Sequence, residues 1–291
     1  MRPFALPDLE VRSRRAWSET FSRSYFGSVN ARPRRDRPAM TLPSPAATLI
    51  PVVRNGATRQ IATIPRDGKG PPVVWLGGFR SDMRATKAEA IDAWAARTGR
   101  AFLRFDYGGH GESEGDFAAF TISDWLADAE AAIARFAPER PILVGSSMGG
   151  WVALLAAKRV RPAGLVLIAP ATDFTEALIW ERLPEEIRAR ITREGVWRRD
   201  SAYSPEPTPV TRALIEDGRR HLLLGGPIDP GCPVHILQGM ADPDVPWAHA
   251  MRLVEALPER GVVLTLIKEG DHRLSDPASL ARLIAAVEGI A

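Results

Sequence analysis

The sequence is poor in cysteine, and it lacks both a long apolar run and a secretory signal. Its 291 residues include one cysteine, Cys232, which excludes an internal disulfide framework and a metal site made of cysteines alone. No apolar stretch approaches the ~20 residues that a membrane-spanning helix needs. The N-terminus does not show the signal-peptide pattern of charge, apolar core and small-residue cleavage site. We therefore expect a protein of a reducing compartment without a membrane span.

Beyond its first 40 residues, the chain also lacks a large net charge of either sign. The net charge is +3 because residues 1–40 hold nine arginines against four acids, whereas the remaining residues carry 29 basic and 31 acidic side chains. A nucleic-acid-binding domain would present a basic face on its folded part, so we expect no nucleic-acid partner. We interpret residues 1–45 as a basic, disordered extension. We predict a cytoplasmic protein, and the mitochondrial matrix is the alternative if this arginine-rich extension is a transit peptide.

From residue 46 onward, short apolar segments alternate with segments of helical periodicity. Asn55-Gly56 predicts a hairpin turn between two initial strands. Further strands are expected at 71–76, 100–107, 141–145, 163–170, 232–240 and 262–270, and helices at 86–98, 125–137, 149–160, 247–257 and 277–290. Strands that are apolar nearly throughout are buried on both faces, as in a parallel sheet covered by helices. We predict one α/β domain at 46–291 with a mostly parallel, doubly wound sheet.

Residues 171–230 interrupt this alternation. They are charged, contain several prolines and offer short helical pieces such as 183–195. An insertion after the strand that ends at Pro170 would lie over the carboxyl ends of the strands, where ligands bind in such sheets. We therefore predict that residues 171–230 form a helical lid.

The segment Gly145-Ser146-Ser147-Met148-Gly149 has the pattern G-x-S-x-G between an apolar strand and a helix. Its glycines permit a turn sharp enough to hold Ser147 at strained backbone angles and to raise its hydroxyl above the strand ends. Ser146 lies one residue too early for this position. An ordinary glycine-rich turn between strand and helix is the alternative interpretation.

A serine hydroxyl becomes a useful nucleophile when a histidine takes its proton and a carboxylate orients that histidine. In this kind of sheet the acid and then the histidine should follow later strands. Of the five histidines, only His272 lies on a loop after the last predicted strand. Asp242 lies on the loop after strand 232–240, and Asp244 is an alternative that could instead cap the next helix. We predict that Ser147, Asp242 and His272 are the catalytic residues.

Acyl transfer also requires backbone N–H groups that point at the developing oxyanion. One is expected from Met148, at the start of the helix after the candidate nucleophile. The other is expected from Phe79, because Gly77-Gly78 after strand 71–76 lets the backbone approach closely. An ordinary Gly-Gly loop is the alternative there. This chemistry needs neither a metal nor an organic cofactor, and we expect none.

The chain resembles the α/β-hydrolase superfamily in six sequence blocks that follow the family's order: GGFRSDMRATKA (77–88), RFDYGGHGES (104–113), ILVGSSMGGW (142–151), REGVWRRDSAYS (193–204), CPVHILQGMADPDVPW (232–247) and GDHR (270–273). Within it, the chain is most similar to the branch of the mitochondrial palmitoyl-protein thioesterase that also hydrolyses acyl glucuronides, with its bacterial relatives. The resemblance runs from about residue 65 to 289. It implies an α/β-hydrolase fold with a lid, and it places the family's catalytic serine, aspartate and histidine on Ser147, Asp242 and His272. Gly77 departs from the histidine that many hydrolases have there.

We therefore expect a serine hydrolase that cleaves acyl thioesters or esters through an acyl-enzyme. The resemblance implies S-palmitoylated proteins or acyl esters such as glucuronides as substrates. The alternatives are a general small-molecule carboxylesterase or a serine peptidase of the same fold, and a catalytically inactive ligand-binding fold, which would usually lack a triad residue. The apolar run Leu178-Ile179-Trp180 would either line an acyl channel or only pack the insertion on the sheet. No oligomeric state follows from the sequence.

Overall fold

The described part of the chain begins with a β-hairpin. A computed structural model describes residues 45–54, 56–201 and 204–290, so the predicted extension at 1–45 lies outside the described residues apart from its last residue. Strands β1 (Thr48–Arg54) and β2 (Ala57–Arg66) pair antiparallel on either side of the predicted turn. The first strands are thus joined as Asn55-Gly56 predicts, although Asn55 itself is not described.

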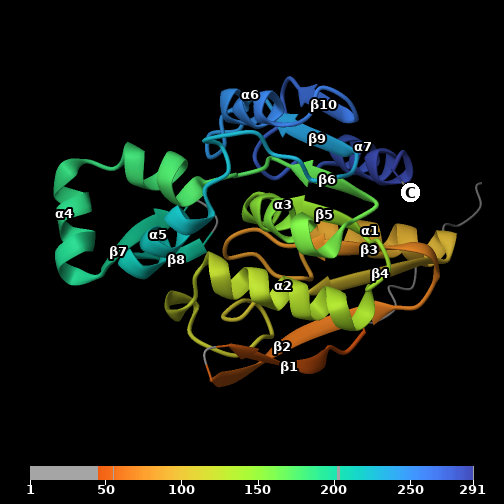
Figure 1. The fold of residues 1–291 in the computed structure, drawn as a ribbon, viewed down its shortest axis with the longest axis horizontal. Helices are drawn as coiled ribbons and strands as arrows, with labels where there is room; N and C mark the ends of the chain where they lie inside the picture. The colour runs from red at the N-terminus through yellow and green to blue at the C-terminus, as the bar shows by residue number, and fades with distance from the viewer. Residues whose placement is uncertain (1–44, 55, 202–203, 291) are drawn as a thin grey trace, which may run out of the picture. The chain divides into compact units, whose positions relative to one another are not determined.

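The central sheet has eight strands in the order β1-β2-β4-β3-β5-β6-β9-β10 (Figure 1). Its remaining strands are β3 (Lys69–Leu76), β4 (Arg100–Phe105), β5 (Ile142–Ser146), β6 (Gly164–Ile168), β9 (Val234–Gly239) and β10 (Val262–Ile267). Every pair from β4 to β10 is parallel. Strands β5 and β6 are buried along their whole length, as expected for apolar strands in the middle of a covered sheet. The predicted mostly parallel α/β sheet is confirmed.

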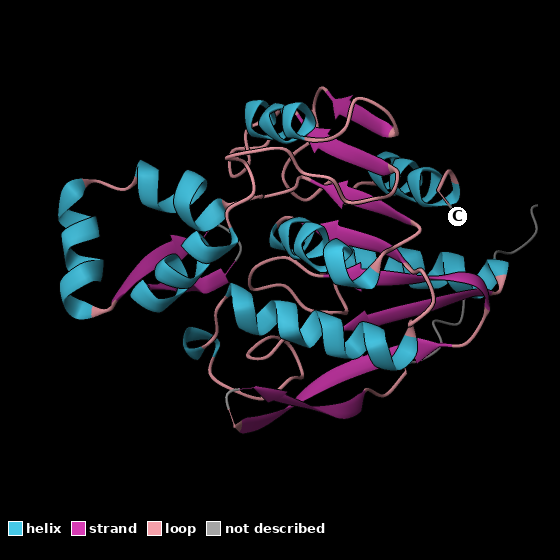
Figure 2. Ribbon diagram, viewed as in Figure 1, coloured by secondary structure: helices cyan, strands magenta, loops and turns pink. Residues whose placement is uncertain are grey.

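Helices cover both faces of this sheet (Figure 2). They are α1 (Thr86–Thr98), α2 (Ile122–Phe136), α3 (Met148–Val160), α6 (Trp247–Ala256) and α7 (Pro277–Glu288). Successive side chains of β5 point to opposite faces: Leu143 packs in the core cluster that contains α2, α3 and α6 residues, whereas Val144 packs in the one that contains α1 and α7 residues. A capping box forms at the start of α2, where Thr121 and Asp124 bind each other's backbone N–H groups.

The insertion after β6 contains more than the short helices that the sequence predicts. A π-helical turn (Thr175–Ile179), a 3-10 turn (Trp180–Arg182) and α4 (Glu185–Glu194) come first, followed by the strands β7 (Val196–Ser201) and β8 (Ser204–Thr211) and then α5 (Arg212–Gly218). The antiparallel β7–β8 hairpin was not predicted, because prolines such as Pro207 and Pro209 argue against a strand. Figure 1 shows the insertion at the side of the domain toward which the parallel strands point.

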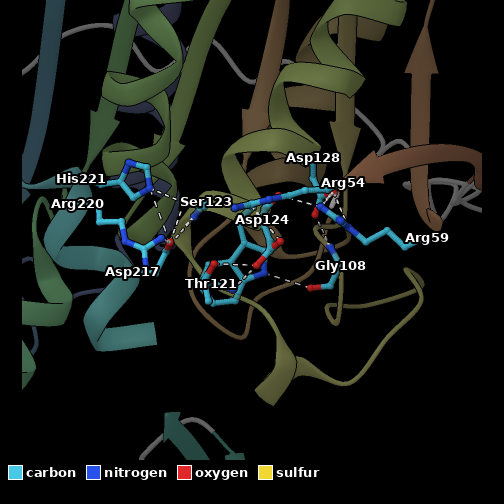
Figure 3. A network of polar contacts seen from close by, with 11 residues as sticks. Arg54, Arg59, Gly108, Thr121, Ser123, Asp124, Asp128, Asp217, Arg220 and His221 are labelled. Atoms are coloured by element: carbon cyan, nitrogen blue, oxygen red, sulfur yellow. Dashed lines mark hydrogen bonds and ion pairs between the residues drawn. The ribbon is translucent and has the colours of Figure 1, made fainter. Parts of the chain in front are cut away.

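A polar network fixes the end of the insertion to α2 (Figure 3). The Ser123 hydroxyl and backbone N–H each donate to Asp217, at 2.8 Å. The His221 Nε2 lies 2.6 Å from the same hydroxyl, and the Trp151 indole donates to the His221 carbonyl at 3.1 Å. The C-terminal part of the insertion is therefore anchored on the core through buried or half-buried hydrogen bonds.

Candidate active site

Ser147 occupies a strained turn between β5 and α3. Its φ of 54° and ψ of −117° lie in a region that residues with a side chain rarely adopt, at a cost on the order of 1–3 kcal/mol. Hydrogen bonds hold it there: the Ser147 N–H donates to the Ile168 carbonyl at 2.8 Å, and its own carbonyl accepts from Gly150 at 3.0 Å. Ser147 is half-buried, while the residues on either side of it are buried. The turn thus exposes this one residue at the start of a buried helix.

The glycines of the turn are required by close backbone contacts. A Cβ on Gly145 would lie 2.3 Å from the Gly149 carbonyl oxygen. A Cβ on Gly149 would lie 2.1 Å from the carbonyl oxygen of Leu76, at the end of β3. Real Cβ atoms do not approach backbone oxygens this closely, so the pattern G-x-S-x-G is a steric requirement of this turn.

Asp242 and His272 form a hydrogen-bonded pair at the ends of β9 and β10. The His272 Nδ1 lies 2.8 Å from the Asp242 Oδ2, and the Asp242 side chain is fully buried. The other oxygen, Oδ1, accepts N–H groups of Asp244 and Val245, both at 2.9 Å. Because both Asp242 oxygens act as acceptors in these contacts, they favour the His272 tautomer with its proton on Nδ1, which leaves Nε2 as an acceptor. Gln238 braces this loop by donating to the Val245 carbonyl at 3.0 Å, a role that sequence reasoning missed.

The two loops that carry this pair lie against each other. The Ala241 N–H donates to the Gly270 carbonyl at 3.0 Å, and a Cβ on Gly239 would lie 2.2 Å from the same carbonyl oxygen. Strands β5, β6, β9 and β10 are neighbours and parallel, so their carboxyl ends share one edge of the sheet. The structure therefore brings Ser147, Asp242 and His272 to that edge, each on the segment that follows a strand.

Asp244 differs from the expectation that it caps the next helix. Helix α6 begins at Trp247 after Pro246, and no side chain caps it. The Asp244 carboxylate is about one-third exposed and lies 3.9 Å from Arg199 on β7. The alternative helix-capping role of Asp244 is therefore wrong, because the N-cap position of α6 is Pro246, two residues further along the chain.

The loop after β3 lies directly against the Ser147 turn. A Cβ on Gly78 would lie 3.4 Å from the Ser147 Cβ and 3.3 Å from the Ser146 carbonyl oxygen. Among the described residues, no atom accepts a hydrogen bond from the Phe79 N–H, whereas the Phe79 ring packs on Phe117 at 4.9 Å between centroids. Met148 is the first residue of α3, where an N–H has no acceptor within the helix. Both predicted oxyanion donors thus belong to segments that border Ser147.

The glycine-rich loop after β4 forms hydrogen bonds to the backbone of the segment that contains Phe79. The buried His110 accepts the Arg80 N–H on Nε2 at 3.2 Å, and its Nδ1 lies 3.2 Å from the Gly108 carbonyl. Burial lowers the pKa of His110 to about 4, so the ring is neutral and can accept that bond. Asp106 accepts the Met83 N–H at 2.7 Å, and burial raises its pKa to about 6. His110 therefore has a structural role, in which it holds the backbone next to Phe79.

The pair also belongs to a potential metal-ligand group. Among the described residues, Asp242, Asp244 and His272 offer ligand atoms that all lie within 4.8 Å of one another. Both Asp242 oxygens and the His272 Nδ1 already take part in hydrogen bonds. A metal ion would have to displace these bonds, so the arrangement favours a hydrogen-bonded acid–histidine pair over a metal centre.

A second serine, acid and histidine meet at the base of the insertion (Figure 3). There the carboxylate of Asp217 binds the Ser123 hydroxyl itself and lies 3.8 Å from the same His221 Nε2 that faces the serine. In a catalytic triad the acid binds the opposite ring nitrogen and so orients the ring. Burial also lowers the pKa of His221, with Asp217 acting against it. The group is arranged as an anchor for the insertion and not as a triad.

Comparisons with known proteins find relatives of this chain among hydrolases. Residues 73–204 match the family model described as serine aminopeptidase, S33. The chain is 33% identical over 226 residues to the mitochondrial palmitoyl-protein thioesterase ABHD10 of Mus musculus, covering 77% of this chain and 76% of that one. It is 34% identical to the Homo sapiens protein, covering 77% and 74%.

Two solved structures are similar over most of their length. A putative hydrolase from Agrobacterium vitis S4 has a TM-score of 0.81 and 48% identity, covering 85% of this chain and 99% of that one. The alpha/beta hydrolase domain-containing protein 10 from mouse has a TM-score of 0.76 and 33% identity, covering 84% and 98%. The similarity therefore includes the sheet, its helices and the insertion.

Proposed function

The chain belongs to the α/β-hydrolase superfamily, in the branch of the palmitoyl-protein thioesterase ABHD10, and from this we propose that it hydrolyses acyl thioesters and esters with Ser147 as nucleophile. Its membership supports a hydrolase of the ester or thioester type. The observation that carries the finer proposal is the partly buried Asp242–His272 hydrogen bond of 2.8 Å, at the sheet edge where Ser147 lies in its strained turn.

In the proposed reaction the Ser147 Oγ attacks the acyl carbonyl carbon while the His272 Nε2 takes its proton. The Phe79 and Met148 N–H groups donate to the oxyanion of the tetrahedral intermediate. The intermediate collapses as the bond to the leaving thiol or alcohol breaks, and His272 gives that group the proton. Water then attacks the acyl-enzyme with His272 as base, which releases the carboxylic acid and restores Ser147. Asp242 holds the Nδ1 proton throughout.

The substrate part of the proposal depends on the relatives more than on the insertion. Leu178 and Ile179 are buried in the main core cluster, and Trp180 packs against it beneath the Arg219 guanidinium. Of the two roles that the sequence leaves open for this run, packing the insertion on the sheet is the one that these contacts favour. We therefore take S-acylated proteins and acyl esters as the proposed substrates because of the name of the ABHD10 relatives.

A serine peptidase is the second candidate, because the matching family model is described as a serine aminopeptidase. The turn, the acid–histidine pair and the oxyanion donors would serve amide hydrolysis equally well. Rates on acyl thioesters, oxyesters of increasing chain length and aminoacyl amides separate the candidates. A preference for the amides would replace the thioesterase proposal.

The cellular compartment of the protein is also part of this proposal. The ABHD10 relatives are named as mitochondrial proteins, which favours the mitochondrial alternative, whereas nothing found supports the cytoplasmic expectation. The similar structure from Agrobacterium vitis shows that related chains also occur in a bacterium. Among the helices of the described residues, none is long and apolar enough to cross a membrane.

A fluorophosphonate probe tests the nucleophile directly, because it bonds covalently to an activated serine. We expect the wild-type protein and Ser146→Ala to be labelled, and Ser147→Ala to be unlabelled. Ser146→Ala is the matched control, since it removes the neighbouring hydroxyl of the same turn. Equal labelling of wild type and Ser147→Ala would refute the assignment.

A further inference from the structure

Lys87 connects the two sides of the candidate active site. It lies in the first turn of α1, the helix that begins directly after the Phe79 loop. Its Nζ donates to the carbonyl oxygen of Arg273, the residue that follows His272, across 186 positions of the sequence. The lysine thus joins the segment with an oxyanion donor to the loop with the candidate base.

The direction of this side chain is unusual for a lysine on a helix surface. Such lysines normally extend their ammonium groups into water. Here the residue is half-buried, and burial lowers the pKa of Lys87 to about 8, with Asp271 and Asp242 acting against this effect and Arg273 acting with it. A partly desolvated ammonium is stable when its donors are satisfied, so the bond to the Arg273 carbonyl compensates for lost hydration.

The loop that carries His272 is held by Leu274, which is buried in the core cluster that contains α1 and α7 residues, and by bonds within the loop. Asp271 and Arg273 are exposed, and the Leu274 N–H donates locally to the Asp271 carboxylate at 2.9 Å. The Arg273 carbonyl also accepts from Ser275 at 3.1 Å, but that bond stays within the loop. The Lys87 bond joins this loop to the helix that follows the Phe79 segment, in addition to the Asp242 pair and the backbone bond to Gly270.

We propose that Lys87 is a positioning residue, which holds the 271–273 loop so that the His272 imidazole faces Ser147 and the oxyanion donors. The inference rests on the proposed function, because it assigns Lys87 a role in setting the geometry of that reaction. Lys87 acts through the loop backbone and contacts no reacting atom. A displacement of the base by about 1 Å is enough to slow such a reaction up to about a hundredfold.

The test compares wild type, Lys87→Met, Lys87→Arg and the control Lys158→Met, an exposed lysine on α3. We expect Lys87→Met to lower both kcat on a p-nitrophenyl acyl ester and the rate of fluorophosphonate labelling by about tenfold. KM should stay within about twofold, because Lys87 does not bind substrate in this proposal. Lys87→Arg, which keeps a charged donor, should recover most of the rate, and Lys158→Met should match wild type.

Hydrogen–deuterium exchange of the peptide 268–276 gives a readout that does not depend on activity. We expect faster exchange in Lys87→Met than in wild type, and a melting temperature within a few degrees of the wild-type value. If Lys87→Met does not fold, Lys87→Gln takes its place in the comparison. Unchanged exchange and an unchanged labelling rate would overturn the proposal, as would a rise in KM with kcat preserved. If wild type itself is not labelled at Ser147, the proposed function fails, and the exchange measurement alone decides whether Lys87 holds the loop.

Discussion

Replacement of Asp242 by asparagine would test whether Asp242 is the acid of the site, and its hydrogen bonds allow the expected losses of rate and stability to be estimated. The Asp242 carboxylate accepts two backbone N–H groups on Oδ1 and the His272 Nδ1–H on Oδ2. An asparagine has one acceptor oxygen, so it can serve the two backbone donors or the imidazole, but not both. Two donors outweigh one, so the amide NH₂ would face His272.

That arrangement would force the His272 proton from Nδ1 to Nε2, the atom that must accept the Ser147 proton. The wrong tautomer in a serine–histidine–acid triad lowers kcat by about 10⁴-fold, which corresponds to about 5.5 kcal/mol in the activation barrier. The folded state should lose less, about 1.5–3 kcal/mol, because only the bond between a charged acceptor and His272 is removed.

Acylation rates with a p-nitrophenyl ester, together with urea unfolding, measure the two effects separately. Asp244→Asn is the matched control, and we expect it to reduce the rate less than about tenfold because solvent screens its one-third-exposed carboxylate. A loss of less than tenfold in Asp242→Asn, or a greater loss in Asp244→Asn, would refute the assignment of Asp242.

Two further predictions concern stability. Burial lowers the pKa of His110 to about 4, so as the pH falls from 6.5 toward 4 the unfolded chain binds a proton that the folded protein does not. Over this range the free energy of unfolding of wild type should fall by about 3 kcal/mol relative to that of His110→Gln, as measured by urea unfolding. A difference between the two proteins that does not change with pH would contradict the burial argument. Asp217→Asn leaves one of the two Ser123 donors without an acceptor and should destabilise the protein by about 1–3 kcal/mol. Limited proteolysis within 171–230 should become faster, while the rate of Ser147 labelling stays within about twofold of wild type. An unchanged rate of proteolysis would argue that Asp217 does not anchor the insertion.

The strands and helices of the domain could be predicted from the sequence because their signals are local. Apolar runs such as 142–145 mark strands buried on both faces, and the capping box at Thr121 marks a helix start. The β7–β8 hairpin escaped prediction because its prolines lack the N–H that a ladder uses. The catalytic roles of Ser147, Asp242 and His272 stay predictions, although the structure brings these residues to one edge of the sheet.

Contacts between distant segments could not be predicted in the same way. The bonds from Lys87 to the Arg273 carbonyl and from Arg80 to His110 depend on which strands are neighbours. Strand order follows from how loops cross the sheet, and a hydrophobic pattern contains no information on it. For His110 only the fold shows that its ring accepts the Arg80 N–H.

The candidate site is built from two parts of the chain, which the pairing of β6 with β9 brings together. Residues up to about 170 provide the candidate nucleophile and both oxyanion donors, residues from about 231 provide the acid and the histidine, and the insertion separates them. During synthesis the part with the candidate nucleophile leaves the ribosome first, before the part with the candidate base. In the proposed mechanism a newly made chain is therefore inactive until β9 and β10, which precede Asp242 and His272, have paired beside β6, so that completion of the sheet also completes the catalytic group.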